Sequence, residues 1–485
     1  MVLSLPCLAS EKIGDLYYNL DSSSLTAEVT YEKFSDTSNY QNLTGAIGIP
    51  ETVVYNGNTY YVTAIGNAAF LFCRNLTNVE IPNPVTSIGD NAFTSCSGLT
   101  SFEIPNSVTS IGYSAFYGCD GLTSVEIGNS VASIGEVAFG MCGGLTSVEI
   151  PSSVTSIGGN PFAGCWSLQS INVDESNEFY SSSEEGVLFN KSKTTLIGCP
   201  GLIEGYIIPD SVTEIGAFAF SNCRGLTSIE IPSSVTSIGY SAFSVCTELT
   251  SVEIGNSVSS IGMWAFDRCI NLRKVEISDL EAWCNIVFED AEANPLYCAR
   301  HLFLNGNEIK DLVIPGSVAS IENYAFYRCS GLTSVVIPGS VISIGNDAFY
   351  GCSDLTSLFI GENVSDIGPS AFDFCNLLNE IVSASPTPPA AYNSIFSEVT
   401  YANAILSVPG SSIDSYRGCI PWSNFLTIKD LDGTGVDEIG LDVPETLYDV
   451  FTLQGVRVKR QASQEDIDAL APGIYIIGGK KVIVK

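Results

Sequence analysis

Residues 98–119 read Gly-Leu-Thr-Ser-Phe-Glu-Ile-Pro-Asn-Ser-Val-Thr-Ser-Ile-Gly-Tyr-Ser-Ala-Phe-Tyr-Gly-Cys, and this phrase returns nearly verbatim from Gly121, Gly144, Gly225 and Gly331. The repeat length is 23 residues, which is the step within each of three groups of cysteines: Cys73, Cys96, Cys119, Cys142 and Cys165; Cys223, Cys246 and Cys269; Cys329, Cys352 and Cys375. A fixed period in this range is typical of stacked units that bury a core only as a column. The phrase therefore predicts a repeat solenoid.

Each repeat has apolar residues placed to form a short strand with one buried face. The stretch Leu122-x-x-Val125-x-Ile127 alternates at its end, as a half-buried strand does. A second extended piece, Ser-Val-x-Ser-Ile-Gly, and a closing Ala-Phe-x-x-Cys segment follow. Stacked coils would set like residues about 4.8 Å apart and form a parallel sheet. We therefore expect a mainly β, right-handed column in which the repeated phenylalanines, Phe70 through Phe372, line the interior.

The composition excludes several classes of protein. The 485 residues include 53 acidic and 20 basic ones, giving a net charge of −33. Such a field repels nucleic acid and anionic membranes, so no nucleic-acid partner is expected. A hydrophobic content of 45% is too high for a disordered chain. No stretch approaches the roughly 20 apolar residues of a membrane-spanning helix.

The cysteines predict buried thiols rather than a disulfide framework. Eleven of the sixteen occupy one repeat position, where vertical neighbours would lie further apart than the roughly 3.8 Å between the Cβ atoms of a disulfide. We expect these eleven to be small apolar residues of the core. Cys7, Cys199, Cys284, Cys298 and Cys419 lie off this column in the sequence pattern, and a Cys284–Cys298 disulfide is left open. No pair has zinc-type spacing, so neither a metal nor a cofactor is expected.

The sequence offers little that could support catalysis. Its single histidine, His301, stands beside Arg300, and a lone histidine is more often structural than catalytic. Metalloprotease, phosphate-loop and nucleophile-elbow motifs are all missing. Carboxylates are abundant, but the repetition explains them better than general acid–base chemistry does. We therefore expect a protein that is not an enzyme.

The order of segments along the chain predicts five parts. Both long gaps between cysteines, from Cys165 and from Cys269, are interpreted as elongated turns of the same column. The first residues resemble the end of a secretory signal, although an ordinary N-terminus is the alternative. The expected parts are a signal-peptide remnant (1–10), an N-terminal β cap (11–63), the solenoid (64–383) with elongated repeats near 174–211 and 278–315, a C-terminal β cap with a linker (384–433), and a small β domain (434–485).

Two resemblances add expectations about location. The Leu-x-x-Val-x-Ile core with Ser-Val-Thr-Ser-Ile-Gly and Ala-Phe-x-x-Cys resembles the BspA-like class of bacterial surface leucine-rich repeat proteins over roughly residues 43–383. The final stretch, which includes Pro472-Gly-Ile-Tyr-Ile-Ile-Gly-Gly-Lys-Lys-Val-Ile-Val-Lys485, is similar to the type IX-like C-terminal sorting domains of exported Bacteroidota proteins. These resemblances imply a protein that is extracellular or held at the outer-membrane surface. We also expect the protein to be a monomer.

The outward residues of the repeat strand are the candidate ligand-binding positions. The residue between Val and Ile should point away from the core, on the concave strand face. The candidates are Glu80, Glu103, Glu126, Glu149, Glu230, Glu253 and Glu276, together with Phe102 and Phe359, which interrupt the polar series. The glutamates either keep a wide sheet soluble or form a docking surface for basic protein segments or divalent cations.

Three functions are compatible with these features. The first is an adhesin-like binding protein for host proteins, other bacteria or glycans. The second is a passive surface stalk, and the third is an accessory module of glycan degradation. Drift at the outward positions favours binding.

Overall fold

The computed structural model describes residues 10–31 and 43–431. Beyond these it gives the backbone of four strands, β38 (Tyr448–Thr452), β39 (Arg457–Ala462), β40 (Gly473–Ile477) and β41 (Lys480–Val484), which pair antiparallel in the order β39-β38-β40-β41. The predicted signal remnant, apart from Ser10, and much of the predicted sorting-like region lie outside the described residues. Two compact units make up the chain: Met1–Ile229 with Ile238–Leu249 and Asp267–Ile270, and Glu230–Ser237 with Thr250–Phe266 and Asn271–Lys485.

The first unit opens with antiparallel strands ahead of the repeats. Strands β1 (Glu11–Ile13), β2 (Leu16–Asp21) and β3 (Thr26–Thr30) pair antiparallel, and β5 (Thr52–Tyr55) forms a hairpin with β6 (Asn58–Ile65). Strand β3 then pairs parallel with β6, and β6 pairs parallel with the first short repeat strand. This arrangement covers the end of the stack, as a solenoid requires.

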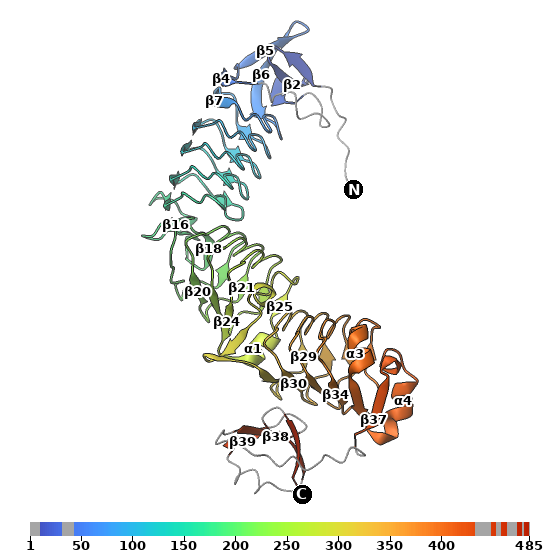
Figure 1. The fold of residues 1–485 in the computed structure, drawn as a ribbon. Helices are drawn as coiled ribbons and strands as arrows, with labels where there is room; N and C mark the ends of the chain where they lie inside the picture. Colours follow the sequence, from blue (N-terminus) through green and yellow to red (C-terminus); the bar gives the residue numbers. More distant parts are fainter. Residues whose placement is uncertain are drawn as a thin grey trace. The chain divides into compact units, whose positions relative to one another are not determined.

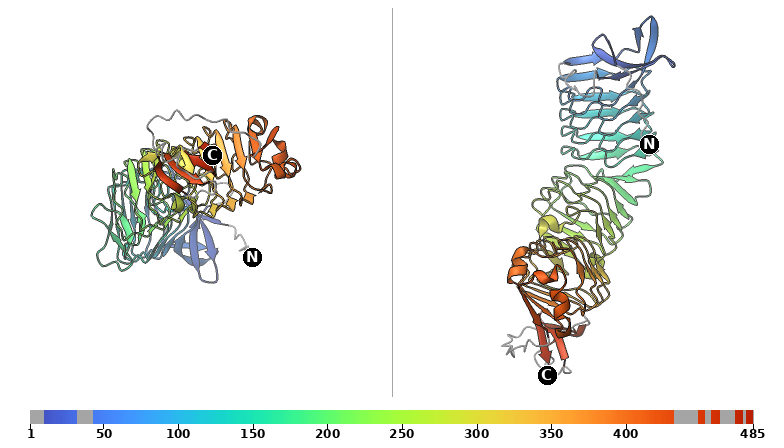
Figure 2. Two further views of the ribbon diagram at one scale, coloured as in Figure 1. Left: turned by 90° about the horizontal axis from the view of Figure 1, so that it is seen from below. Right: turned by 90° about the vertical axis from the view of Figure 1, so that its right-hand side faces the viewer.

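Each regular turn contains one long and one short strand (Figures 1 and 2). The long strands of the first unit are β4 (Gly45–Gly48), β7 (Leu76–Glu80), β9 (Ser101–Ile104), β11 (Ser124–Ile127), β13 (Ser147–Ile150) and β15 (Ser170–Val173). The short strands are β8 (Ser87–Ile88), β10 (Ser110–Ile111), β12 (Ser133–Ile134) and β14 (Ser156–Ile157). The short strands continue one ladder from β6 to β14, whereas the long strands pair two by two, as β4–β7, β9–β11 and β13–β15. The predicted parallel stacking is confirmed, with the continuous ladder on the short strands.

The predicted phenylalanine column fills the interior. In the first unit Phe70, Phe93, Phe116, Phe139 and Phe162 stack with ring centroids 5.0–5.6 Å apart and planes within 14° of parallel. Each ring is fully or almost fully buried. Because the spacing of the rings matches the spacing of the turns, each of these five repeats adds one ring to the apolar core of the unit.

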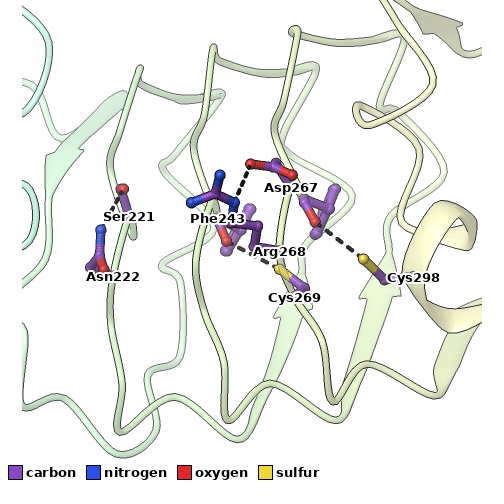
Figure 3. A network of polar contacts seen from close by, with 8 residues as sticks. Ser221, Asn222, Phe243, Asp267, Arg268, Cys269 and Cys298 are labelled. Atoms are coloured by element: carbon purple, nitrogen blue, oxygen red, sulfur yellow. Dashed lines mark hydrogen bonds and ion pairs between the residues drawn. The ribbon is translucent and has the colours of Figure 1, made fainter.

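The cysteines do more than fill space. The thiol of Cys96 donates a hydrogen bond to the carbonyl oxygen of Phe70 in the preceding turn, at 3.0 Å, and Cys119 repeats this contact with Phe93 at 3.1 Å. Figure 3 shows the same contact from Cys269 to Phe243, at 3.2 Å. Cysteine suits this position because its side chain is small enough for the core and its S–H group is a weak hydrogen-bond donor to the buried carbonyl oxygen.

The glycine of the Ile-Gly pair reflects close packing between turns. A Cβ atom on Gly112 would lie 2.6 Å from the backbone nitrogen of Asp90 in the preceding turn. No larger residue fits there without moving the backbone. Gly112 is not among the glycines with a positive φ, so the need for glycine comes from this contact rather than from the backbone conformation.

The first elongated turn adds an antiparallel meander. Strands β16 (Tyr180–Ser182), β17 (Leu188–Asn190) and β18 (Thr195–Gly198) pair in that order, and β18 pairs parallel with β19 (Glu214–Ile215). The buried Asn177 side chain donates hydrogen bonds to the carbonyl oxygens of Pro151 and Val154 in the preceding turn, at 2.9 and 3.0 Å. The elongated segment is thus bonded directly to the regular repeats.

The second elongated turn contains helices that the sequence analysis did not predict. It comprises α1 (Leu280–Cys284), β25 (Val287–Phe288), α2 (Leu296–Ala299), β26 (Leu302–Leu304) and β27 (Asn307–Glu308). The Asp279 carboxylate caps α1 by accepting from the backbone N–H groups of Glu281 and Ala282, an arrangement typical of a helix N-terminus. The indole nitrogen of Trp283 donates to the carbonyl oxygen of Ala325 at 2.9 Å, which ties α1 to the following repeat.

The second elongated turn also contains Cys284 and Cys298, the pair for which a disulfide was left open. Both residues are thiols, so the two are not bridged. Cys298 donates to the carbonyl oxygen of Phe266 at 3.7 Å, the contact made by the column cysteines (Figure 3). The interpretation of Cys298 as lying off the column is therefore wrong, because it replaces the repeat cysteine within an elongated turn.

The later repeats use the same pair of strands. Their long strands are β20 (Ser228–Ile231), β22 (Ser251–Ile254), β24 (Lys274–Ile277), β28 (Asp311–Val313), β30 (Ser334–Ile337), β32 (Ser357–Ile360) and β34 (Glu380–Ser383). The short strands are β21 (Ser237–Ile238), β23 (Ser260–Ile261), β29 (Ser320–Ile321), β31 (Ser343–Ile344), β33 (Asp366–Ile367) and β35 (Ala390–Ala391). In the second unit β28, β30, β32 and β34 form one parallel ladder, which continues into β36 (Ile405–Val408) and β37 (Thr427–Asp430).

The segment after the last repeat contains helices as well as the expected strands. These are α3 (Glu398–Asn403), η2 (Gly410–Ser412), α4 (Ile413–Arg417) and η3 (Trp422–Asn424). The last ring of the column, Phe372, stacks on Phe396 at 5.5 Å, and Tyr401, Trp422 and Phe425 contact Phe396 edge to face. This aromatic cluster closes the end of the phenylalanine column.

Thiol titration tests the account of the cysteines. Burial raises the pKa of the Cys119, Cys165, Cys223 and Cys246 thiols well above the ordinary value. They should therefore stay protonated and unreactive in the native protein at pH 8, since the thiolate is the nucleophile. After denaturation without reductant, titration should count at least the eleven column thiols. A count of six or fewer would contradict the account.

Candidate binding face

In the first unit, outward glutamates line the long strands as predicted. Glu80, Glu103, Glu126 and Glu149 lie on β7, β9, β11 and β13, and all four side chains are exposed. The register places Glu103 directly opposite Glu126, and Glu149 opposite Asn172. Because directly paired strands lie about 4.8 Å apart, the Glu103 and Glu126 carboxylates are held close together without a basic residue between them in the register.

The second unit carries a shorter acidic row. Glu230, Glu253 and Glu276 lie on the successive strands β20, β22 and β24, and the register places Glu253 opposite Glu276. Lys274 forms an ion pair with Glu276 at 2.8 Å, and the Gly306 N–H donates to the other oxygen of that carboxylate at 2.6 Å. The row ends there, since the next strand in register presents Phe303.

The pKa of Glu253 is raised by its surroundings in this row. Partial burial, then the neighbouring charges of Glu230 and Glu276, raise the pKa of the Glu253 carboxyl above its ordinary value, against the opposing charge of Lys274. Like charges next to a carboxylate disfavour its ionised form. A cationic ligand would lower this pKa and be favoured by the same field.

The prediction that Phe102 points outward is wrong. Phe102 pairs in register with the inward Val125 and is only 3% exposed. Its ring packs edge to face against Phe93 and Phe116, with centroids 5.1 and 4.7 Å away. Phe102 therefore replaces the repeat valine in the core, and it is not part of the binding face.

Phe359 lies on the outward side but is not exposed. It is in register with Val336 and Val382, at the position that holds glutamate in earlier repeats. Nevertheless its side chain is only 6% exposed. Phe359 thus belongs to an apolar stretch of the outward face and not to the acidic rows.

An aromatic ladder in the second unit was not foreseen from the sequence. Tyr297, Tyr327 and Tyr350 stack with centroids 6.0 and 5.0 Å apart, and Phe374 packs against Tyr350 at 5.1 Å. The Arg328 guanidinium lies over the Tyr297 ring at 4.8 Å. The repeated Ala-Phe-Tyr at Tyr327 and Tyr350 is the signal that could have revealed it. Since the tyrosine faces stack on one another, little ring face is left for a ligand.

Nothing in the described part of the chain resembles a catalytic or metal centre. The sole histidine of the sequence, His301, contacts Glu308 at 2.7 Å across the β26–β27 hairpin, a structural contact. Among residues 10–31 and 43–431, no group of histidine, cysteine and carboxylate side chains could hold a metal ion. No helix in the portion described is long and apolar enough to cross a membrane.

Several solved bacterial structures are similar to this chain. The pneumococcal vaccine antigen PcpA is 20% identical with a TM-score of 0.50, over 87% of this chain and 98% of that one. A leucine rich cell surface protein from Faecalibacterium prausnitzii is 26% identical (TM-score 0.44, 78% and 95% covered). A leucine-rich repeat protein from Bacteroides ovatus is also 26% identical (TM-score 0.42, 87% and 99% covered). A search of curated proteins found no match.

The repeats themselves settle the family. The family described as the BspA type leucine rich repeat region matches in six copies, over residues 63–186, 198–294 and 298–415. These ranges cover most of the chain and leave out residues 187–197 and 295–297, which lie within the two elongated turns. The protein belongs to the BspA type leucine-rich repeat family.

Proposed function

We propose that this protein is a non-catalytic, adhesin-like surface protein that docks basic segments of a protein partner on its acidic rows. The family is associated with the cell surface, and leucine-rich repeat proteins typically bind proteins. The observation that carries the proposal is the direct register of like charges, Glu103 opposite Glu126 and Glu253 opposite Glu276. The Glu103–Glu126 pair, about 4.8 Å apart, repels by roughly 0.9 kcal/mol in water before screening. Lys274 offsets part of the repulsion between Glu253 and Glu276.

A cationic partner would relieve this repulsion. Salt screens it little, because the Debye length is about 8 Å at physiological ionic strength. Lysine or arginine side chains spaced along an extended segment would meet successive carboxylates of the row. The partner would be a protein of the host or of another bacterium; a glycan ligand would have to bind elsewhere on the repeats. The protein itself would act as a monomer.

A triple substitution separates binding from solubility. In Glu103→Gln, Glu126→Gln, Glu149→Gln, the side chains keep their size and lose three charges. We expect affinity for partners found in a screen of host matrix and bacterial surface proteins to fall, and the salt dependence of binding to weaken, because fewer counter-ions are released. Affinity and its salt dependence are measured by surface plasmon resonance at several ionic strengths.

The matched control removes the same charge away from the rows. Asp120→Asn, Glu175→Gln, Glu184→Gln changes three exposed carboxylates of the same unit and should leave binding nearly unchanged. If both triple variants bind like the original protein, the acidic row is a solubility device. The alternative of a passive stalk without a specific ligand would then be favoured, and an accessory role in glycan degradation would remain to be tested.

Export is a second part of this proposal. We propose a Bacteroidota origin and a sorting role for residues 434–485, on the similarity of this segment to sorting domains and on the four strands β38–β41 within it. Deleting residues 436–485 in the native host should abolish surface exposure, measured by protease sensitivity of intact cells, while the repeats still fold. Unchanged sensitivity would argue that the segment is not a sorting element.

A further inference from the structure

The outward face of the second unit is apolar from β28 onward. Val313, Val336, Phe359 and Val382 succeed one another in direct register along β28, β30, β32 and β34. They occupy the position that holds glutamate in the acidic rows. These four residues are called the apolar row below.

The middle of the apolar row is covered, although it faces away from the core. Val336 is 2% and Phe359 is 6% exposed. They form a cluster separate from the main core, with Val313, Val382 and Ala384 packed against it. Their strand neighbours Val335 and Leu358 point to the opposite side and are buried in the column. A glutamate at the same position, such as Glu126, is exposed. An occupant of this face would account for the difference in exposure.

We propose that the apolar row is the docking surface for the C-terminal strands β38–β41 of the same chain. The path of the chain supports this occupant. Strand β37 lies in the same ladder as the apolar row, in the order β28-β30-β32-β34-β36-β37. The sixteen residues 432–447 connect it to β38 and could span up to about 50 Å when extended. The nearest strand of the row, β34, is two strands from β37, roughly 10 Å away.

The chemistry of the two surfaces is complementary. A small four-stranded sheet needs an apolar partner, because one of its faces must be buried for it to be stable. Residues 448–485 contain six basic residues (Arg457, Lys459, Arg460, Lys480, Lys481 and Lys485) against four acidic ones (Asp449, Glu465, Asp466 and Asp468), a net charge of +2 in a chain of −33. The positive charge of this segment attracts it to the acidic repeats. At the apolar row it can bury apolar side chains without burying an outward glutamate.

Full-length Val336→Glu, Phe359→Glu tests the proposal by hydrogen exchange. Glutamate is the residue that earlier repeats carry at this position, so the stack should tolerate it. We expect amide exchange in β38–β41 to accelerate by about tenfold or more, because two buried apolar side chains become charged. Phe359→Leu, which stays apolar, and Asn172→Glu, which adds an outward charge in the first unit, should leave that exchange unchanged. Exchange in β29–β33, read in the same experiment, reports whether the repeats stay folded.

A second measurement does not require the repeats to tolerate glutamate at positions 336 and 359. In native full-length protein, Phe359→Cys should react with maleimide at least about tenfold more slowly than the exposed Glu126→Cys, with sites identified by peptide mass spectrometry. Equal labelling rates, or unchanged exchange in β38–β41 of the double variant, would overturn the proposal. A third outcome would also overturn the proposal: the original protein is dimeric by light scattering, the double variant is monomeric, and exchange in β38–β41 is the same in both. The apolar row would then bind a second copy of the chain.

Discussion

Replacing Phe116 with alanine is expected to lower the free energy of unfolding by about 3–5 kcal/mol. The ring is fully buried and stacks on Phe93 and Phe139, both at 5.1 Å, while Phe102 packs against its edge at 4.7 Å. Removing it leaves a cavity that the stacked backbone cannot close, since the turns are held by ladder hydrogen bonds. Denaturant unfolding followed by circular dichroism measures the loss.

Phe374→Ala provides the matched control. This ring lies in the same Ala-Phe-x-x-Cys segment of a later repeat but is 52% exposed. It should cost less than about 1 kcal/mol. Because long repeat arrays can lose cooperativity, hydrogen exchange of β10 and β12 should show the Phe116→Ala effect locally. Equal losses from both substitutions would contradict a core built on the phenylalanine column.

Replacing Trp283 with alanine is expected to cost a similar amount, about 3–5 kcal/mol. Trp283 anchors α1 of the second elongated turn: its side chain is 1% exposed, its ring packs on Phe288 at 5.4 Å, and its indole N–H bonds the Ala325 carbonyl. The substitution therefore removes both a large apolar contact and a buried hydrogen bond. Thermal and denaturant unfolding of the variant measure the effect.

Trp264→Ala is the control for this prediction. Trp264 is 45% exposed, and its alanine variant should cost much less. Trp283→Phe should lie between the two, since it keeps most of the apolar area but loses the N–H donor. If Trp283→Ala left stability unchanged, the elongated turn would not be an integral part of the repeat stack.

The fold could be predicted because its signal is repeated many times. The strand, the phenylalanine and the cysteine recur at a 23-residue step, so their agreement outweighs the weakness of any single copy. Segments that occur once were predicted less well. The helices α1 and α2 rest on local features such as the Asp279 cap, and a single Asp before an apolar residue is a weak signal.

The candidate site was predicted in part, for a related reason. Alternation around Val125 and Ile127 correctly assigned Glu126 to the outward side. Phe102 was wrongly assigned to the outward side because a phenylalanine stands where the neighbouring repeats have valine. Its position in the repeat, which is that of the inward Val125, gives the correct side. Phe359 was assigned to the correct side, but its burial could not be foreseen. Burial at this position depends on contacts from outside the repeats, and the repeat pattern carries no information about such contacts.

The central claim is that the acidic row docks a cationic segment, and hydrogen exchange of the full chain with a synthetic lysine- and arginine-rich peptide tests it most directly. The account predicts that the peptide slows exchange in β9, β11 and β13, that this protection weakens with added salt, and that the Glu103→Gln, Glu126→Gln, Glu149→Gln variant loses it. Protection that is absent, or that persists unchanged in the triple variant, would contradict the claim.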